Sequence, residues 1–183
     1  EAFDGAGSKA NTVFGVILGT GVGAGIVIGK KIHIGKNKIA GEWGHNPLPW
    51  AHEGELPGKK CYCGRTGCLE TFISGPAIER EFKDLHGRNL NMKNIVRESG
   101  AGNLKAEQVI KNLEDRLARA LAHAINILDP DSIVLGGGLS NIDRLYSNVP
   151  KIWGEYIFSD DVSTVLSKAS FGDSSGVRGA AWL

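Results

Sequence analysis

The sequence predicts an α/β domain, and three observations lead to this prediction. Short apolar runs separated by glycine-rich turns open the chain, which is typical of strands joined in an antiparallel meander. Beyond residue 70, helical segments alternate with short buried strands, as expected of α–β–α units. A cysteine cluster between these two parts indicates a small metal-bound loop. The 183 residues are enough for one well-filled domain, so we expect residues 1–183 to form a single domain.

The composition is that of an ordinary soluble globular protein, with 42% hydrophobic and 22% charged residues. A formal net charge of +1, with no run of Lys and Arg, argues against a nucleic-acid partner. No apolar run approaches the length of a membrane span and no signal peptide is present, so we expect no membrane partner. Reduced cysteines fit a cytoplasmic location.

The first strands are predicted from apolar, β-branched runs. Residues Thr12–Leu18 form a buried strand, and a glycine loop, Gly19–Gly25, leads into a second strand at Ile26–Ile28. A third short strand follows at Lys30–His33. A nucleotide-binding P-loop or a dinucleotide fingerprint would need a helix after the glycines, so both are excluded.

Helices are predicted from three- and four-residue apolar spacing. Ser74–His86 has Ser74 as its N-cap and places Ile78, Phe82 and Leu85 on one face. A weaker helix lies within Asn89–Gly102. The longest helix, Ala106–Leu128, stops at Asp129-Pro130 because proline disfavours helical geometry in the residue before it. Its apolar positions are Ala106, Val109, Ile110, Leu113, Leu117, Ala120, Leu121, Ala124, Ile127 and Leu128.

The C-terminal part of the chain continues the alternation. A buried strand, Ile133–Leu135, runs into the glycine turn Gly136–Gly138. We expect a helix over Ile142–Tyr156, a last strand near Val162–Leu166 and a small closing helix, Val177–Leu183.

The metal prediction rests on the stretch from Gly41 to Glu70. All three cysteines, Cys61, Cys63 and Cys68, lie within eight residues, and an odd number of thiols cannot pair off. Three thiolates and one imidazole make a tetrahedral structural zinc site. His45 is the best fourth ligand because it lies in a turn near the cysteines, and its rivals are His52, His33, His86 and His123. The alternative is three reduced cysteines packed as small apolar groups.

The two motifs in this stretch resemble a known family. Glu-x-Gly-His followed by Cys-x-Cys-Gly-x-x-Gly-Cys-x-Glu is similar to the ROK family of sugar kinases and sugar-responsive repressors. The resemblance implies an actin-like ATPase, ribonuclease-H-like C-terminal domain with a zinc-bound loop. It also implies zinc ligands at His45, Cys61, Cys63 and Cys68, and sugar contacts at Glu42, His45 and Glu70. The sequence of Gly41–Trp50 most resembles that of the bacterial fructokinases (manno(fructo)kinases) of this family.

Two glycine-rich turns are candidates for nucleotide binding. Backbone N–H groups in such turns cradle phosphates, and Thr20 adds a hydroxyl. The family resemblance implies a phosphate loop with Gly19, Thr20, Gly21 and Gly23, and adenosine beside Gly136, Gly137 and Gly138. The alternatives are a flexible β-turn at the first site and close strand–helix packing at the second.

The sequence contains no match to the family's catalytic aspartate. We therefore expect the chain to be the C-terminal part of an ATP-dependent hexose kinase, inactive alone, with fructose as acceptor, structural Zn²⁺ and Mg²⁺ accompanying ATP. An N-acetylhexosamine or glucose kinase is an alternative acceptor class. The sugar-sensing domain of a ROK-type repressor, or a zinc-stapled interaction domain without ligand, are alternative functions. A homodimer is expected from the family.

Overall fold

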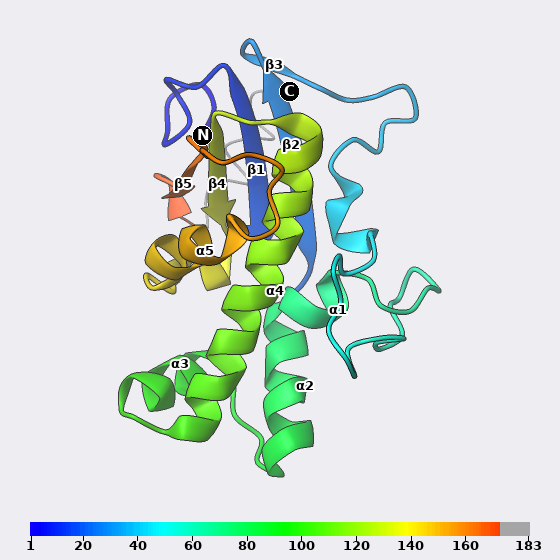
Figure 1. The fold of residues 1–183 in the computed structure, drawn as a ribbon, viewed down its shortest axis with the longest axis vertical. Coiled ribbons are helices and arrows are strands. Elements are labelled where there is room, and N and C mark those ends of the chain that lie inside the picture. The colour runs from blue at the N-terminus through cyan, green and yellow to red at the C-terminus, as the bar shows by residue number, and fades with distance from the viewer. Residues whose placement is uncertain (173–183) are drawn as a thin grey trace.

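The computed structural model describes residues 1–172 and contains a five-stranded sheet with helices packed on one face (Figure 1). The strand order is β3-β2-β1-β4-β5. Helix α4 runs along the sheet, whereas α2 and α3 extend beyond it at the far end (Figure 1). Among residues 1–172, no helix combines the length and the apolar character needed to cross a membrane.

The strands form a mixed sheet. Strands β1 and β2 pair in antiparallel fashion, as do β2 and β3, whereas β1–β4 and β4–β5 are parallel pairs. The predicted three-strand meander and the buried strand after α4 are therefore confirmed. The bounds are β1 Thr12–Leu18, β2 Val22–Ile28, β3 Lys31–Ile32, β4 Ser132–Gly136 and β5 Val165–Lys168.

Helices α2, α3 and α4 begin at side-chain caps. The Ser74 hydroxyl accepts a hydrogen bond from Ala77 N at the start of α2, and Asn91 and Asn103 cap α3 and α4 in the same way. The bounds are α1 Glu70–Ile73, α2 Gly75–His86, α3 Met92–Gly100, α4 Leu104–Leu128 and α5 Leu145–Trp153, with 3₁₀ helices η1 Glu42–His45 and η2 Gly138–Asn141.

The main core lies between the sheet and the helices. In β1, Phe14, Val16 and Leu18 alternate toward α4, while Val13 joins a small cluster on the opposite face. The α4 positions predicted as apolar from Ala106 to Ala124 are buried. Each element presents one apolar face to this layer, so the helices are packed firmly on the sheet. The glycine turns at the ends of the strands are therefore held in fixed places.

Several predicted elements are corrected by the structure. The first glycine loop is shorter than expected: β2 begins at Val22, so Gly23 belongs to a strand and pairs with Ile17. The last strand is β5, two or three residues later than predicted. The helix expected from Ile142 starts only at Leu145, after η2. The closing helix expected at 177–183 lies outside the described residues.

Two apolar side chains lie on the solvent side rather than in the core. Leu85 is 55% exposed and Ile127 is 74% exposed, although both fit the helical spacing. Each lies in the last turn of its helix and lines an open cavity, Leu85 beside Phe72 and Ile127 beside Phe14 and Ile26. The predicted helical spacing was correct, but the sequence does not show where the neighbouring elements that bury each helix end.

Ion pairs fix α5 on α4. Arg144 donates to both carboxylate oxygens of Glu107 and of Glu114, at 2.6–3.2 Å. The hydrogen bonds from Arg144 and from the Ser99 hydroxyl lower the pKa of Glu107 to about 2. Because the ordinary pKa is 4.5, this pairing stabilises the fold above pH 4.5 and is lost as the pH falls toward 2.

We therefore expect the free energy of unfolding to fall as the solution is acidified from pH 4.5 toward pH 2. Glu107→Gln should lower this free energy at neutral pH and make its fall on acidification smaller. Urea unfolding at neutral pH and at about pH 3 measures both effects. The exposed Glu53→Gln is the matched control, and an acid-induced fall as large in Glu107→Gln as in the parent protein would contradict the assignment.

Candidate functional site

The 3₁₀ helix η1 carries Glu42 and His45 and packs directly on β2. A Cβ atom at residue 44 would lie 1.9 Å from the carbonyl oxygen of Val22, so only glycine allows this approach. The neighbouring Trp43 is buried and contacts Phe14 edge-on, with ring centroids 5.7 Å apart. The buried side of η1 therefore fixes the direction in which Glu42 and His45 leave the chain.

The four predicted metal ligands come together. The ligand atoms of His45, Cys61, Cys63 and Cys68 all lie within 4.8 Å of one another. His45 Nδ1 is 3.6 Å from Cys61 Sγ, and Cys63 Sγ is 3.6 Å from Cys68 Sγ. Tetrahedral zinc with ordinary bond lengths requires about 3.5 Å between nitrogen and sulfur and about 3.8 Å between sulfurs. The donor set and its spacing therefore fit zinc.

The thiols of this cluster do not ionise equally without a cation. Burial raises the pKa of Cys68 to about 12, whereas a backbone hydrogen bond from Arg65 lowers the pKa of Cys63 to about 7. A divalent cation would stabilise all three sulfurs as thiolates, which is the form that coordinates zinc. Of the rival histidines, His52 contacts Asp115 instead, with 3.8 Å between Nδ1 and the carboxylate.

The second nitrogen of His45 points away from the sulfurs. Its Nε2 lies 2.9 Å from the Tyr62 hydroxyl and 3.9 Å from the Glu42 carboxylate. The Tyr62 ring is 82% exposed and contacts the imidazole edge-on. Sequence reasoning missed Tyr62, although its place between two ligand cysteines was a signal for it. A polar group on the second nitrogen orients a ligand histidine, and Tyr62 has the geometry for that role.

Glu70 connects the segment of predicted metal ligands to the first glycine turn. It begins α1, two residues after Cys68, and its carboxylate accepts a hydrogen bond of 3.0 Å from Val22 N. The other carboxylate oxygen lies 3.9 Å from Cys61 Sγ. The structure thus places Glu70 between the predicted metal ligands and the turn, and Glu42 and His45 line a cavity of about 510 Å³.

The turn at Gly19–Gly21 is held on two sides. Gly75 N, the first amide of α2, donates to the carbonyl of Gly19 at 2.9 Å, and Glu70 holds Val22 at the other end. Thr20 is exposed at the tip. The backbone of this turn therefore has little freedom, although two of its three residues are glycines.

The second glycine turn lies against the end of β1. Gly137 has φ +80°, and a Cβ atom there would lie 2.6 Å from the carbonyl oxygen of Leu18. This contact brings η2 next to the first turn, and one cavity of about 760 Å³ opens between them. Its lining residues are Gly19, Thr20, Gly75, Pro76, Glu79, Met92, Lys93, Val96, Gly138, Leu139, Asn141 and Ile142. The contribution of α3 was not predicted, because nothing in its sequence marks a ligand.

Two predicted nucleotide residues lie elsewhere. Gly23 and Gly136 line a different cavity, of about 400 Å³, between the sheet and the N-terminal residues. Gly23 lies inside β2 and Gly136 is the last residue of β4, so both belong to the sheet rather than to the turns at its edge. Of the residues predicted to bind nucleotide, Gly19, Thr20 and Gly138 are the ones that the structure brings to the larger cavity.

Comparison with known proteins identifies the family. The model of the ROK family matches residues 1–183. This chain belongs to the ROK family. An N-acetyl-D-glucosamine kinase of Vibrio vulnificus (strain YJ016) is 37% identical over 187 residues, which cover 100% of this chain and 62% of the relative. The chain thus spans less than two thirds of the length of the curated relatives that it matches.

Solved structures share the fold. A ROK hexokinase from Thermus thermophilus matches with a TM-score of 0.86 and 29% identity, covering 99% of this chain and 59% of its own. A ROK glucokinase from Streptomyces griseus in complex with glucose and AMPPNP matches with a TM-score of 0.83, 26% identity and coverages of 96% and 61%. A ROK transcriptional regulator homologous to the E. coli MLC protein matches with a TM-score of 0.83 and 26% identity, covering 99% of this chain and 47% of its own. The predicted actin-like α/β fold is therefore confirmed.

We expect purified, reduced protein to hold about one zinc ion per chain, because the donor set is complete and correctly spaced. Cys63→Ser should lose this stoichiometry and lower the free energy of unfolding. Elemental analysis with urea unfolding measures both, and Arg65→Ala is the control from the same loop. Stoichiometric zinc in Cys63→Ser, or none in the parent protein, would contradict the assignment.

Proposed function

We propose that this chain is the nucleotide- and sugar-binding part of an ATP-dependent hexose kinase. The observation that carries the proposal is the single cavity of about 760 Å³ lined by both glycine turns, through Gly19, Thr20 and Gly138. Glu70 connects the first of these turns to Cys61, whose sulfur lies next to His45 of the motif Glu-x-Gly-His. Phosphoryl transfer needs a nucleotide and an acceptor hydroxyl side by side, and this link sets their relative positions.

The cavity suits a nucleotide in both its polar and its apolar parts. Backbone amides of the turns would bind phosphate oxygens, as in other oriented N–H nests. Met92, Val96 and Ile142 offer an apolar surface for a base, and Lys93 offers a positive charge at the rim. The structure with AMPPNP among the similar proteins supports this assignment. We propose that Mg²⁺ accompanies the ATP phosphates.

The sugar is assigned to the side of the metal loop. Carboxylates accept hydrogen bonds from sugar hydroxyls strongly, which suits Glu42 and Glu70. His45 would bind zinc through Nδ1, and its Nε2 would border the sugar, at the place now bounded by Tyr62. No aspartate lines the nucleotide cavity among the described residues, so we propose that the proton-accepting aspartate comes from another part of the protein.

The acceptor is proposed to be N-acetylglucosamine or glucose. The curated relative is named for N-acetyl-D-glucosamine, and a similar structure contains glucose. Fructose, expected from the sequence of Gly41–Trp50, is the alternative acceptor. A sugar-sensing role is the second candidate, since a ROK transcriptional regulator shares the fold over 99% of this chain. Intact glycine turns on one cavity favour the kinase.

We expect the full-length protein that contains this chain to phosphorylate N-acetylglucosamine or glucose with a kcat/KM at least about tenfold above that for fructose. A coupled assay with the three sugars at equal ATP measures the ratio. The highest kcat/KM with fructose would overturn the acceptor assignment. Sugar binding without any ATP turnover would favour the sensing role.

Glu42→Gln and Glu70→Gln should separate the two halves of the site. Each charged hydrogen bond to a sugar is worth about 1.5–3 kcal/mol, so Glu42→Gln should lower the kcat/KM for sugar by at least about tenfold. Its KM for ATP should stay within about twofold. Glu70→Gln should also raise the KM for ATP, because Glu70 holds the first glycine turn through Val22. Equal effects of Glu42→Gln on both substrates would contradict this division.

A further inference from the structure

The loop between the first and second predicted zinc ligands, residues 46–60, has little apolar anchoring of its own. Leu48 is buried, but Trp50 and Leu56 are about half exposed. A metal fixes only the two ends of this loop, at His45 and Cys61. The contacts of the middle of this loop therefore also affect how firmly η1, with Glu42 and His45, is held in place.

The first part of the loop is held by the cysteine segment. Leu48 N donates to the carbonyl of Gly67 at 3.1 Å, and Leu69 N donates to the carbonyl of Asn46 at 2.9 Å. Residues 46–48 thus run antiparallel to 67–69, next to Cys68. Beyond Leu48 the chain leaves this pairing.

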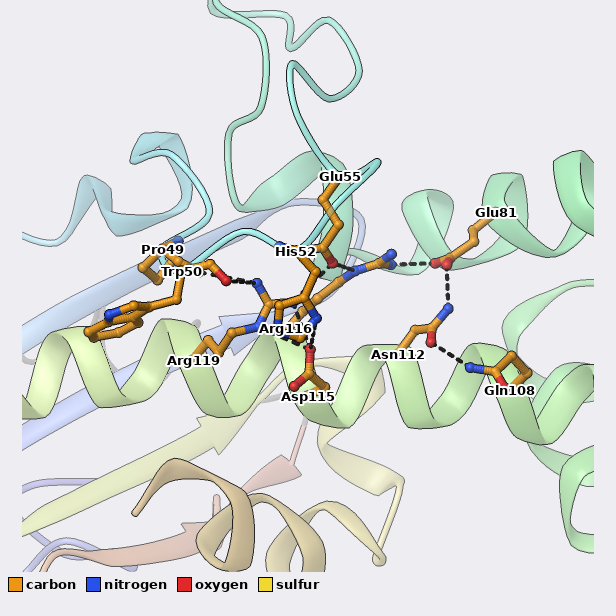
Figure 2. A network of polar contacts seen from close by, with 10 residues as sticks. All are labelled: Pro49, Trp50, His52, Glu55, Glu81, Gln108, Asn112, Asp115, Arg116 and Arg119. Atoms are coloured by element: carbon orange, nitrogen blue, oxygen red, sulfur yellow. Dashed lines mark hydrogen bonds and ion pairs between the residues drawn. The ribbon is translucent and has the colours of Figure 1, made fainter. Parts of the chain in front are cut away.

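The next part of the loop is held by one arginine of α4 (Figure 2). Arg119 Nη1 donates to the carbonyl oxygens of Pro49 and Trp50, at 3.1 and 3.0 Å. Its Nη2 donates to Glu55 at 2.9 Å, and both Nε and Nη2 donate to Asp115. Arg119 has an exposed fraction of 0%, so all of its donors are used inside the protein.

A second arginine extends this contact to the other helices (Figure 2). Arg116 donates to Glu55 at 2.8 Å and to Glu81 of α2 at 2.5 Å. Its guanidinium lies 5.5 Å from the ring centroid of Phe72 in α1, two residues after Glu70. Burial alone would raise the pKa of Glu55, but the hydrogen bonds from Arg119 and Arg116 outweigh it and lower the pKa to about 2. The loop carboxylate is therefore held as an anion between two cations.

We propose that Arg119 is a positioning residue for the metal and sugar site. By holding two successive carbonyl groups just after the 46–48 segment, it fixes the course of the loop, and through it the placement of His45 and Glu42. Arg119 acts through this loop and does not touch the substrate. The sugar half of this inference rests on the proposed function; the metal half rests on the four ligands alone.

The guanidinium geometry is essential to this role. Two carbonyls and two carboxylates surround Arg119, and its planar group with five N–H donors can serve all four. A lysine ammonium keeps the charge but has three donors at one point, so it cannot reach both the carbonyls and the carboxylates. Arg119→Lys therefore loosens the loop while the buried positive charge remains.

The test uses the full-length protein that contains this chain, loaded with zinc. Arg119→Lys should raise the sugar KM at least about tenfold while the ATP KM stays within about twofold, because displacing a contact by a fraction of an ångström weakens only the site that it belongs to. Zinc release to a competing chelator should be at least about tenfold faster. Arg144→Lys, the same change in the Arg144–Glu107–Glu114 pairing of α4 and α5, is the matched control and should leave sugar KM and zinc release unchanged.

A merely stabilising role gives a different result. It would lower the folded fraction and hence the apparent kcat, with unchanged KM values and an unchanged zinc release rate, and that outcome overturns the proposal. If Arg119→Lys does not fold, the same measurements are made on Glu55→Gln. This change weakens the hydrogen bond between Arg119 and the loop, so the same outcomes support or overturn the proposal. If the parent protein phosphorylates no hexose, the proposed function fails, and the zinc release rates alone decide the role of Arg119.

Discussion

The hydrogen bond from Val22 N to the Glu70 carboxylate is the contact on which the rest of the site depends. Cys68 and Glu70 are two residues apart. The start of α1 therefore places both a predicted metal ligand, Cys68, and the carboxylate that holds the first glycine turn, Glu70. On the other side of the turn, Gly75 N holds the carbonyl of Gly19. The segment 68–75 therefore fixes the predicted metal ligands and the first glycine turn relative to each other.

Buried charge rather than apolar packing extends this arrangement across the helices. Arg119 is completely buried and Arg116 nearly so, and each is surrounded by carboxylates or carbonyls from segments far apart in sequence. Such pairs contribute little net stability compared with an apolar replacement, but they allow far fewer alternative arrangements than apolar contacts do. A loop that must present two polar side chains to a small polar ligand benefits from that restriction.

The sequence predicted what depends on local pattern. The strands, the cap at Ser74 and the clustering of His45 with three cysteines follow from residues close in the chain. The glycine loop was wrong beyond Gly21, because pairing of β2 with β1 extends through Gly23 and outweighs the flexibility of glycine. Arg119 could not be predicted as buried: its type indicates solvent, and its partners at 49–55 lie more than sixty residues away. The contribution of α3 to the cavity of about 760 Å³ was missed for the same reason.

The predicted metal ligands and a buried arginine act on one loop, residues 46–60. Residues 41–70 contain six glycines and few buried apolar side chains, so chain entropy opposes a single conformation. Zinc would close the loop at His45 and the cysteines, which lowers the entropy of everything between, while Arg119 defines the path of the part farthest from the metal. Neither constraint replaces the other, because the metal acts on the ends and the guanidinium on the middle. Rigid presentation of Glu42 and His45 thus requires both, on a scaffold whose helices are already fixed by the core.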